Sequence, residues 1–164
     1  MPRYEYRAAT DADLEWIWNK DIAENPGDDR YLRWKKQFID DNHSGAARTF
    51  VVVADGEPVG QGTLLFSPAC RAISGRLVLA DHEKTANINA LRIEEKHEGQ
   101  GHISKLVRFM ERHAADQGYV CLTIGVDEGE ARNRAIYSHW GYDRLVLDTE
   151  ESGERVLYYA KDIG

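Results

Sequence analysis

The sequence has few residues that could cross-link a fold or bind a metal. Its 164 residues include only two cysteines, Cys70 and Cys121, which form neither a CxxC pair nor a cluster with histidine. A secreted disulfide framework and a zinc site are therefore disfavoured, and we expect no metal site. A chain of this length with 42 % hydrophobic residues can bury a core without such cross-links.

Long apolar segments are lacking as well. Residues Met1 to Glu5 carry no apolar run behind their charge, so we expect no secretory signal peptide. No window approaches the roughly 20 apolar residues that a membrane-spanning helix needs. These absences predict a cytoplasmic location and no membrane partner.

Positive charge is in deficit. The chain has 21 lysines and arginines against 28 aspartates and glutamates, which gives a net charge of −7. Nucleic-acid binding depends on clustered lysine and arginine, so we expect no nucleic-acid partner. An acidic surface is compatible with a cationic substrate such as an amine, although it also serves solubility.

The pattern of the chain predicts a single α+β domain over residues 1–164, without repeats, linkers or low-complexity segments. We expect strands at 4–8, 49–54, 57–66, 88–93, 119–126, 144–147 and 155–160, and a further short strand at 76–79. We expect helices from the Thr10 cap to Pro26, and at 29–41, 102–117 and 131–139. This order predicts a mixed, mostly antiparallel twisted sheet flanked by helices.

A glycine-rich segment, Glu98-Gly99-Gln100-Gly101-His102-Ile103-Ser104, lies between a predicted strand and a predicted helix. The first N–H groups of a helix lack intrahelical acceptors, and the helix dipole adds partial positive charge there. Glycine lets the backbone approach a ligand and adopt positive φ. The segment is therefore a candidate phosphate site, although an ordinary strand-to-helix turn would use the same glycines.

Two common nucleotide motifs fit this segment poorly. A Walker A loop is absent, because no GxxxxGK[ST] occurs. The spacing is close to a dinucleotide fingerprint, but five residues separate Ile93 from Gly99 and the motif does not open the first βαβ unit. A nicotinamide-binding protein stays open as an alternative.

A second constellation is the segment Ala135-Ile136-Tyr137-Ser138-His139-Trp140-Gly141-Tyr142, which places a tyrosine on a short helix that ends at a glycine. With both segments, residues 86 to 142 resemble the GNAT superfamily of N-acetyltransferases. The cofactor motif of that family reads about [QR]-x-x-G-x-[GA] before a helix with paired leucines. Its later motif reads A-x-x-L-Y-x-x-x-G-F or a close variant.

The alignment of the helices places Leu106-Val107 on the paired leucines and Gly101 on the first family glycine. Glu98 then replaces the family's Gln or Arg, and Ile103 stands where Gly or Ala is usual. Because Glu98 cannot donate a hydrogen bond to a phosphate, another residue is expected to supply the positive charge. The candidates are Lys96, His102, Lys105 and Arg108.

The resemblance implies the acyl-CoA N-acyltransferase (GNAT) fold, acetyl-CoA as cofactor, and transfer of an acetyl group to a primary amine by direct attack. It implies that Tyr137 protonates the departing thiolate. A phenol with a pKa of about 10 can donate a proton to a thiolate of similar basicity. Asn133 is expected to substitute for a cofactor-binding asparagine whose family position is Glu130 here. The implied cofactor-binding residues are Leu91, Arg92, Ile93, Glu98, Gly99, Gln100, Gly101, His102, Ile103, Ser104 and Asn133.

The sequence leaves the acceptor and the general base open. A small molecule or a peptide would both present an amine, and Trp16, Tyr31 and Trp34 could line its pocket. The candidate bases are Glu94, Asp127, His82 and His139, although ordered water can also take the proton. The missing base keeps a catalytically silent acyl-CoA-binding regulatory module as the alternative function. Many GNAT relatives pair, which leaves a homodimer open.

Overall fold

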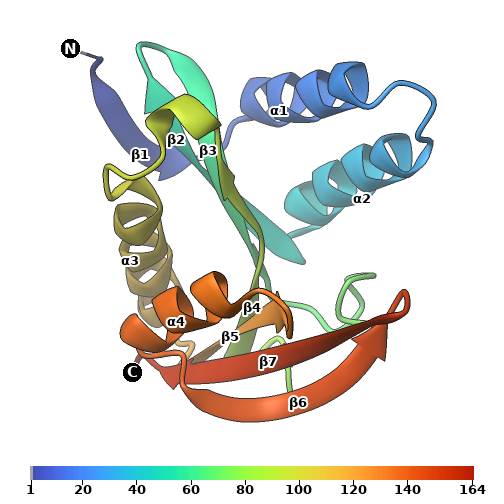
Figure 1. The fold of residues 1–164 in the computed structure, drawn as a ribbon, viewed down its shortest axis with the longest axis vertical. Helices are drawn as coiled ribbons and strands as arrows, with labels where there is room; N and C mark the ends of the chain where they lie inside the picture. The colour runs from blue at the N-terminus through green and yellow to red at the C-terminus, as the bar shows by residue number, and fades with distance from the viewer. Residues whose placement is uncertain (1) are drawn as a thin grey trace. The chain divides into compact units, whose positions relative to one another are not determined.

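The computed structural model describes residues 2–164, and in them seven strands and four α-helices follow the order expected from the sequence. The strands are β1 (Tyr4–Ala8), β2 (Ala47–Ala54), β3 (Glu57–Leu65), β4 (Thr85–Ile93), β5 (Cys121–Asp127), β6 (Arg144–Glu151) and β7 (Glu154–Asp162). The helices are α1 (Asp11–Glu24), α2 (Arg30–Ser44), α3 (His102–Asp116) and α4 (Ala131–His139), with a short 3-10 helix, η1, at Glu95–His97. Figure 1 shows these elements along the chain.

The strands form one sheet in the order β1-β2-β3-β4-β5-β7-β6. The pair β4–β5 is parallel, whereas β1–β2, β5–β7 and β6–β7 are antiparallel. This mixed, mostly antiparallel sheet with helices confirms the predicted α+β fold class. None of the helices in residues 2–164 combines the length and the apolar character that a membrane crossing requires.

The chain forms two compact units, and each is built from segments that are not continuous in sequence. The first unit contains the chain up to Thr63 together with Ala90–Phe109, and the second contains Leu64–Asn89 and Met110–Gly164. Three elements, β3, β4 and α3, contribute residues to both units.

In the first unit, α1 begins with the capping box expected from the sequence. The Thr10 hydroxyl accepts a hydrogen bond from the Asp13 N–H (3.2 Å), and the Asp13 carboxylate accepts one from the Thr10 N–H (2.8 Å). Asp13 also forms an ion pair with Arg7 of β1. The next residue, Leu14, and Trp18 one helical turn later are both buried, so the cap fixes the start of a helix that packs by one face.

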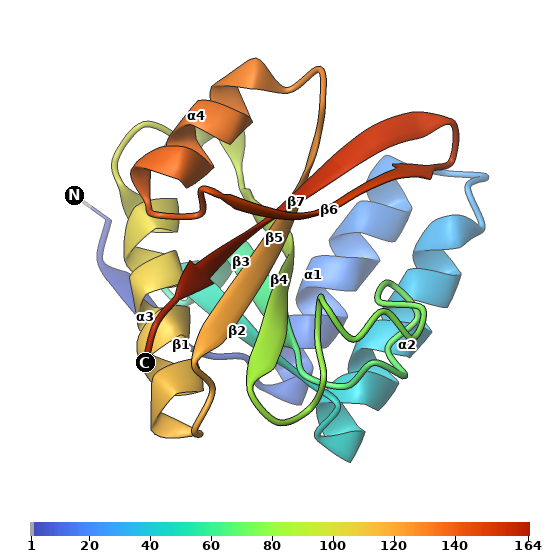
Figure 2. The same ribbon diagram turned by 90° about the horizontal axis from the view of Figure 1, so that it is seen from below.

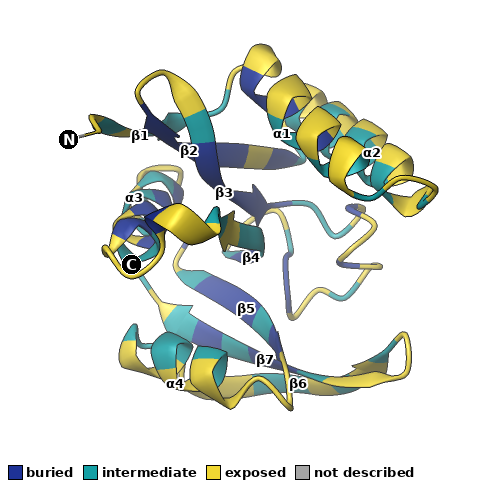
Figure 3. Cartoon of the chain, turned by 45° about the horizontal axis from the view of Figure 1, so that its top comes forward, coloured by how far each residue is buried: buried dark blue, intermediate teal, exposed yellow. Residues whose placement is uncertain are grey.

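Strand β2 is buried along nearly its whole length because helices of the first unit cover both of its faces. Successive side chains of a strand point to opposite faces. The Phe50 ring contacts Phe109 of α3, with centroids 5.7 Å apart. Its neighbour Thr49 is bonded twice to Asn42 of α2: the Thr49 N–H donates to Asn42 Oδ1 (2.9 Å), and Asn42 Nδ2 donates to Thr49 Oγ1 (3.0 Å). Figure 3 shows β2 as buried and the outer faces of α1 and α2 as exposed.

In the second unit, β5 is paired on both sides. Thr85–Ile88 of β4 pair in parallel with Cys121–Ile124, and β7 pairs antiparallel along the whole of β5 (Figure 2). Leu122, Thr123 and Ile124 are buried, which explains the near-continuous apolar run of this strand.

The short strand expected at residues 76–79 is wrong. These residues form turns, in which the Leu79 N–H donates to the Arg76 carbonyl (2.9 Å). The Arg76 guanidinium donates to the carbonyls of Ala72 (2.7 Å) and Ile73 (2.8 Å). These local bonds satisfy backbone groups that would otherwise need a partner strand.

Candidate functional site

The glycine segment forms an exposed loop between η1 and α3. Gly99 has φ +75° and Gly101 has φ +82°, a region that residues with a Cβ rarely occupy. A Cβ added to either glycine would meet no atom within 4 Å, so the space above the loop is open. Both glycines are therefore needed for their backbone conformation, and the loop is accessible to a ligand.

The amide groups of this loop have no acceptor within residues 2–164. The N–H groups of Gly99 through Ser104 take part in none of the backbone or side-chain hydrogen bonds of the described chain. The first bond of α3 runs from the Lys105 N–H to the Gly101 carbonyl (3.1 Å). Free N–H groups at a helix start, together with the helix dipole, form an anion site.

Of the residues expected to supply positive charge in place of Glu98, His102 is not suitable. Its side chain is buried, and burial, together with the charges of Lys105 and His97, lowers its pKa below the ordinary 6.5. The imidazole is therefore neutral at pH 7. Lys96, Lys105 and Arg108 are exposed and remain candidates for this charge.

Strand β4 changes direction close to the residues expected to contact the pantetheine arm. Ala90 has φ +52°, which is uncommon for a residue with a Cβ and marks a local distortion of the strand. Its register with β5 runs only from Thr85 to Ile88, although β4 continues to Ile93. The end of β4 instead stays close to β3, where a Cβ on Gly60 would lie 3.1 Å from the Arg92 carbonyl oxygen.

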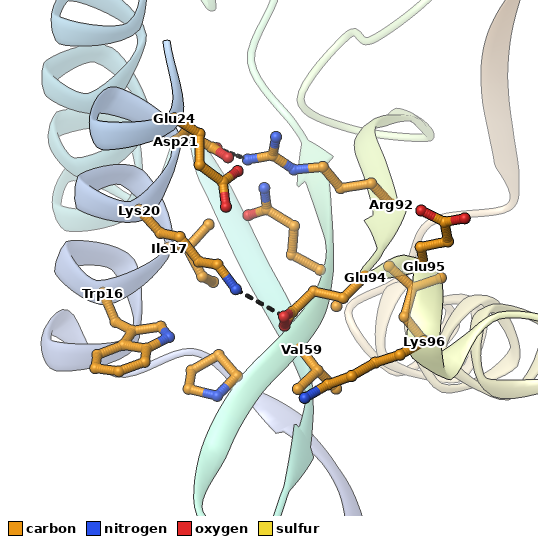
Figure 4. A pocket seen from close by; sticks show the side chains of 14 residues that line it. Trp16, Ile17, Lys20, Asp21, Glu24, Val59, Arg92, Glu94, Glu95 and Lys96 are labelled. Atoms are coloured by element: carbon orange, nitrogen blue, oxygen red, sulfur yellow. Dashed lines mark hydrogen bonds and ion pairs between the residues drawn. The ribbon is translucent and has the colours of Figure 1, made fainter. Parts of the chain in front are cut away.

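A pocket of about 860 Å³ lies in the first unit, between α1, the start of β3 and the end of β4 (Figure 4). Two ion pairs hold α1 here: Lys20 with Glu94, the residue that follows β4 (2.7 Å), and Asp21 with Arg92 of β4. The lining residues are Trp16, Ile17, Lys20, Asp21, Glu24, Pro58, Val59, Gly60, Gln61, Arg92, Ile93, Glu94, Glu95 and Lys96.

The side chain of Arg92 is held on the pocket wall by three partners. Besides Asp21, the Gln61 side-chain oxygen, with the amide oriented toward Arg92, accepts from the guanidinium at 2.7 and 2.8 Å. The Trp18 ring lies 5.5 Å from the guanidinium carbon. The guanidinium thus contacts side chains of α1 and β3. This leaves the backbone of Arg92 as the part of the residue that fits the predicted role in cofactor binding.

The two remaining candidates lie on α4 in the second unit. Tyr137 is half-buried, with its ring 5.7 Å from that of Trp140, and its hydroxyl forms no hydrogen bond with any described residue. Burial, and to a lesser extent the charge of Glu130, raises the pKa of Tyr137 above 10.0, so the hydroxyl keeps its proton at neutral pH. Asn133 donates to the Glu130 carboxylate (3.4 Å), a contact within its own helix.

Only some of the residues predicted from the sequence as candidate bases or as pocket-lining residues line the pocket. Glu94 and Trp16 line the pocket. Asp127, His82 and His139 are exposed residues of the second unit. Tyr31 and Trp34 do not line the pocket and instead contact each other at 4.9 Å.

Sequence reasoning missed Lys20, Asp21 and Gln61, although all three line the pocket. The one available signal was the pair of opposite charges at positions 20 and 21 on a predicted amphipathic helix. Such charges are usually solvated, and their partners at 94 and 92 are found only once the strand order is known.

The sequence profile of the acetyltransferase (GNAT) family matches residues 11–142, which is most of the chain. The chain belongs to the acetyltransferase (GNAT) family. The predicted resemblance and enzyme class, an N-acetyltransferase, are thereby confirmed. Among curated proteins, no sequence matches this GNAT chain.

Solved structures support the GNAT fold. A protein from Desulfovibrio desulfuricans, described as a GNAT acetyltransferase, has a TM-score of 0.74 at 12 % identity, covering 99 % of this chain and 100 % of its own. An acetyltransferase from Salmonella typhimurium that modifies the N-terminal serine of ribosomal protein L7/L12 has a TM-score of 0.71 at 17 % identity, covering 98 % and 95 %. A GNAT acetyltransferase from Elizabethkingia anophelis, solved with acetyl-CoA bound, has a TM-score of 0.63 at 14 % identity, covering 97 % of both chains.

Proposed function

We propose that this GNAT protein is an acetyl-CoA-dependent N-acetyltransferase that transfers an acetyl group to a primary amine by direct attack. One observation carries the proposal: the unpaired amide groups of Gly99 through Ser104, shaped by two glycines with positive φ, at the start of α3. Such a loop suits a diphosphate, and the similar acetyltransferase from Elizabethkingia anophelis was solved with acetyl-CoA bound.

The residues present fit coenzyme A in their chemistry. The free N–H groups of residues 99–104 would hold the diphosphate, with exposed Lys96, Lys105 or Arg108 supplying positive charge. The backbone of Leu91, Arg92 and Ile93, beyond the paired part of β4, would bind the pantetheine arm. When bound, the cofactor supplies an activated acetyl group. Tyr137 holds a proton on its hydroxyl and would donate it to the departing sulfur.

The pocket of the first unit is the proposed acceptor site. Four carboxylates line it, of which Asp21 and Glu94 are paired with Arg92 and Lys20. The carboxylates of Glu24 and Glu95 and the half-exposed indole of Trp16 are the groups that favour a cationic amine. Glu94 is the candidate base that faces this space, and Lys20 holds its carboxylate at 2.7 Å. A small-molecule amine and a peptide N-terminus both present the required chemistry.

Ligand-dependent thermal stability tests the cofactor. Acetyl-CoA at 100 times its Kd should stabilise the protein by about 2.7 kcal/mol, whereas NAD should not. Thiol release with a panel of small amines and peptide N-termini then tests transfer. Stabilisation by NAD instead would favour a dinucleotide-binding protein, and stabilisation by acetyl-CoA without thiol release on any amine would favour a silent regulatory module.

Replacement of the proposed acid tests the role of Tyr137. Tyr137→Phe should lower kcat by about tenfold or more and leave the Kd of acetyl-CoA nearly unchanged, because the hydroxyl acts only as the thiol departs. Tyr159→Phe is the matched control, since Tyr159 is also a half-buried tyrosine of the second unit whose hydroxyl has no described partner. A kcat for Tyr137→Phe within about twofold of the wild type would contradict the acid role.

A further inference from the structure

Two tyrosines of β1 are bonded to two histidines that lie more than ninety positions away in sequence. Tyr4 and Tyr6 are two residues apart, so their side chains lie on the same face of the strand. The Tyr4 hydroxyl lies 2.8 Å from His97 Nδ1, and the Tyr6 hydroxyl lies 2.6 Å from His102 Nδ1. The rings also pack together, since the Tyr4 and His102 centroids are 3.9 Å apart.

These histidines lie at the two ends of the glycine loop. His97 is the last residue of η1, and His102 is the first residue of α3. Both are buried, with 7 % and 6 % of their surfaces exposed, whereas residues 98–101 between them are all exposed. The loop is thus exposed in its middle and anchored to β1 at both ends, all within the first unit (Figure 1).

Gln100 determines which nitrogen of His102 carries the proton. The Gln100 side-chain oxygen lies 3.3 Å from His102 Nε2, and a carbonyl oxygen can only accept. Nε2 is therefore the donor, and Nδ1 accepts from the Tyr6 hydroxyl. Burial, followed by the nearby Tyr4, raises the pKa of Tyr6, so this hydroxyl keeps the proton that it donates.

The charged form of His102 is unfavourable at this place. The titratable and polar groups around it are Tyr4 and Tyr6 of β1, His97, Gln100 and Lys105. None of them carries a negative charge at neutral pH, and the start of α3 adds partial positive charge. A proton on Nδ1 would also face the Tyr6 hydroxyl and remove its acceptor. Burial, then Lys105 and His97, accordingly lower the pKa of His102.

We propose that Tyr4, Tyr6, His97 and His102 are positioning residues that hold the glycine loop in the conformation that binds the diphosphate of the acyl-CoA. The ligand in this inference rests on the proposed function. The four residues act through the loop backbone and have no part in the acetyl transfer itself. Their contribution is therefore expected in binding and in the order of the loop.

Removal of one hydroxyl at a time tests the clamp. Tyr4→Phe and Tyr6→Phe should each raise the KM for acetyl-CoA by about three- to tenfold, with kcat within about twofold, because a lost anchor weakens binding in the ground and transition states alike. In the protein without ligand, hydrogen exchange should become faster at the Glu98 and Lys105 amides, which are bonded at the two ends of the loop to the carbonyls of Glu95 and Gly101 (3.1 Å each). Tyr142→Phe is the matched control, because it removes a buried tyrosine bond to Glu111 (2.7 Å) in the second unit.

The pH profile separates positioning from general stability. In the wild type, the KM for acetyl-CoA should rise as the pH falls through the lowered pKa of His102, because protonation of Nδ1 leaves the Tyr6 hydroxyl without its acceptor. His102→Asn keeps an oxygen acceptor near the position of Nδ1 but cannot be protonated, so it should bind acetyl-CoA near neutral pH and flatten this rise. His102→Leu cannot be protonated either, but it has no acceptor for the Tyr6 hydroxyl, so it should raise the KM at every pH.

Two results would overturn the inference. One is an unchanged KM for Tyr4→Phe and Tyr6→Phe together with unchanged exchange at the Glu98 and Lys105 amides. The other is the same low-pH rise in KM for His102→Asn as for the wild type. The exchange measurement needs no cofactor, so it remains decisive for the clamp if acetyl-CoA fails to bind the wild type. Failure of acetyl-CoA to bind the wild type would reject the proposed function, whereas faster exchange in the variants would still support the anchoring role.

Discussion

At the scale of single residues, the glycines of the loop between η1 and α3 are set apart by their backbone conformation and by the empty space above them. Gly99 and Gly101 have positive φ and no neighbouring atom where a Cβ would be. Gly60 shows the opposite case, because a Cβ there would come within 3.1 Å of Ile93 and the Arg92 carbonyl. A substitution in the loop therefore tests conformation alone, whereas one at Gly60 tests packing.

Alanine at the loop glycines should cost conformational energy without a steric clash. Gly99→Ala and Gly101→Ala are each expected to lower the free energy of unfolding by about 1–2 kcal/mol, the cost of the left-handed region for a residue with a Cβ. Urea unfolding measures this change. Gly129→Ala is the control, because Gly129 also has open space around it but lacks positive φ. Equal effects at all three positions would show that φ is not the cause.

Single residues also show what the sequence could not reveal. The glycine pattern predicted the loop correctly, because the need for positive φ is local. The bonds of Tyr4 to His97 and of Tyr6 to His102 depend on how β1 packs against residues more than ninety positions later. Likewise, nothing in the alanine at position 90 indicates its φ of +52°. Contacts that tertiary packing creates have no local signal in a single sequence.

At the scale of elements, the cap of α1 depends on one buried carboxylate. Burial alone would raise the pKa of Asp13, but hydrogen bonds from Arg7 and Thr10 outweigh it and lower the pKa below the ordinary 3.8. A lowered folded-state pKa means that the unfolded chain binds the proton more tightly. The stability that Asp13 contributes is therefore present above about pH 4 and is lost as the pH falls through the folded-state pKa.

Asp13→Asn should show this dependence directly. The variant should be less stable than the wild type at pH 7, and the difference should shrink as the pH falls below about 4, because both proteins then lack the charge. Urea unfolding at pH 7, 5 and 3 provides the comparison. Asp143→Asn is the control, since Asp143 is exposed and has no described hydrogen bond or ion pair. A gap between wild type and Asp13→Asn that stays constant over this pH range would contradict the ion-pair account.

The elements themselves were largely readable because capping and periodicity act over short distances. Helix α4 has the predicted bounds, Ala131–His139, and α1 begins at the predicted capping box. The wrong prediction of a strand at residues 76–79 also has a local cause. An apolar triplet resembles a strand, but the Arg76 side chain satisfies the carbonyls of Ala72 and Ile73 and favours a turn. Hydrophobic periodicity gives no indication that a side chain will form hydrogen bonds with nearby backbone carbonyls.

At the scale of the whole molecule, the chain passes between its two units three times, after Thr63, Asn89 and Phe109. Each of these points falls inside or at the end of a regular element: β3, β4 or α3. Unfolding one unit alone would break these elements part-way along their length and expose their hydrogen bonds to solvent. We therefore expect the chain to unfold as one cooperative domain, as the sequence predicts.

Two natural probes report on the units separately. Trp16, Trp18 and Trp34 belong to the first unit, so fluorescence of the variant Trp140→Phe follows that unit alone. The Cys70 thiol, 2 % exposed, belongs to the second unit and reacts with a labelling reagent only when that unit opens. Fluorescence and pulsed thiol labelling in urea should give the same midpoint if the unfolding transition is shared.

Destabilising changes placed in one unit make this test decisive. Thr10→Ala removes the α1 cap in the first unit, at a cost of about 1 kcal/mol. Ile124→Val removes one methylene from the buried β5 strand in the second unit, at a cost of about 0.5–1.5 kcal/mol. In a single cooperative domain, each variant shifts the fluorescence and labelling midpoints together, because neither unit is stable without the segments that the other shares with it. If Thr10→Ala moved only the tryptophan transition and Ile124→Val only the Cys70 transition, the units would be independent domains.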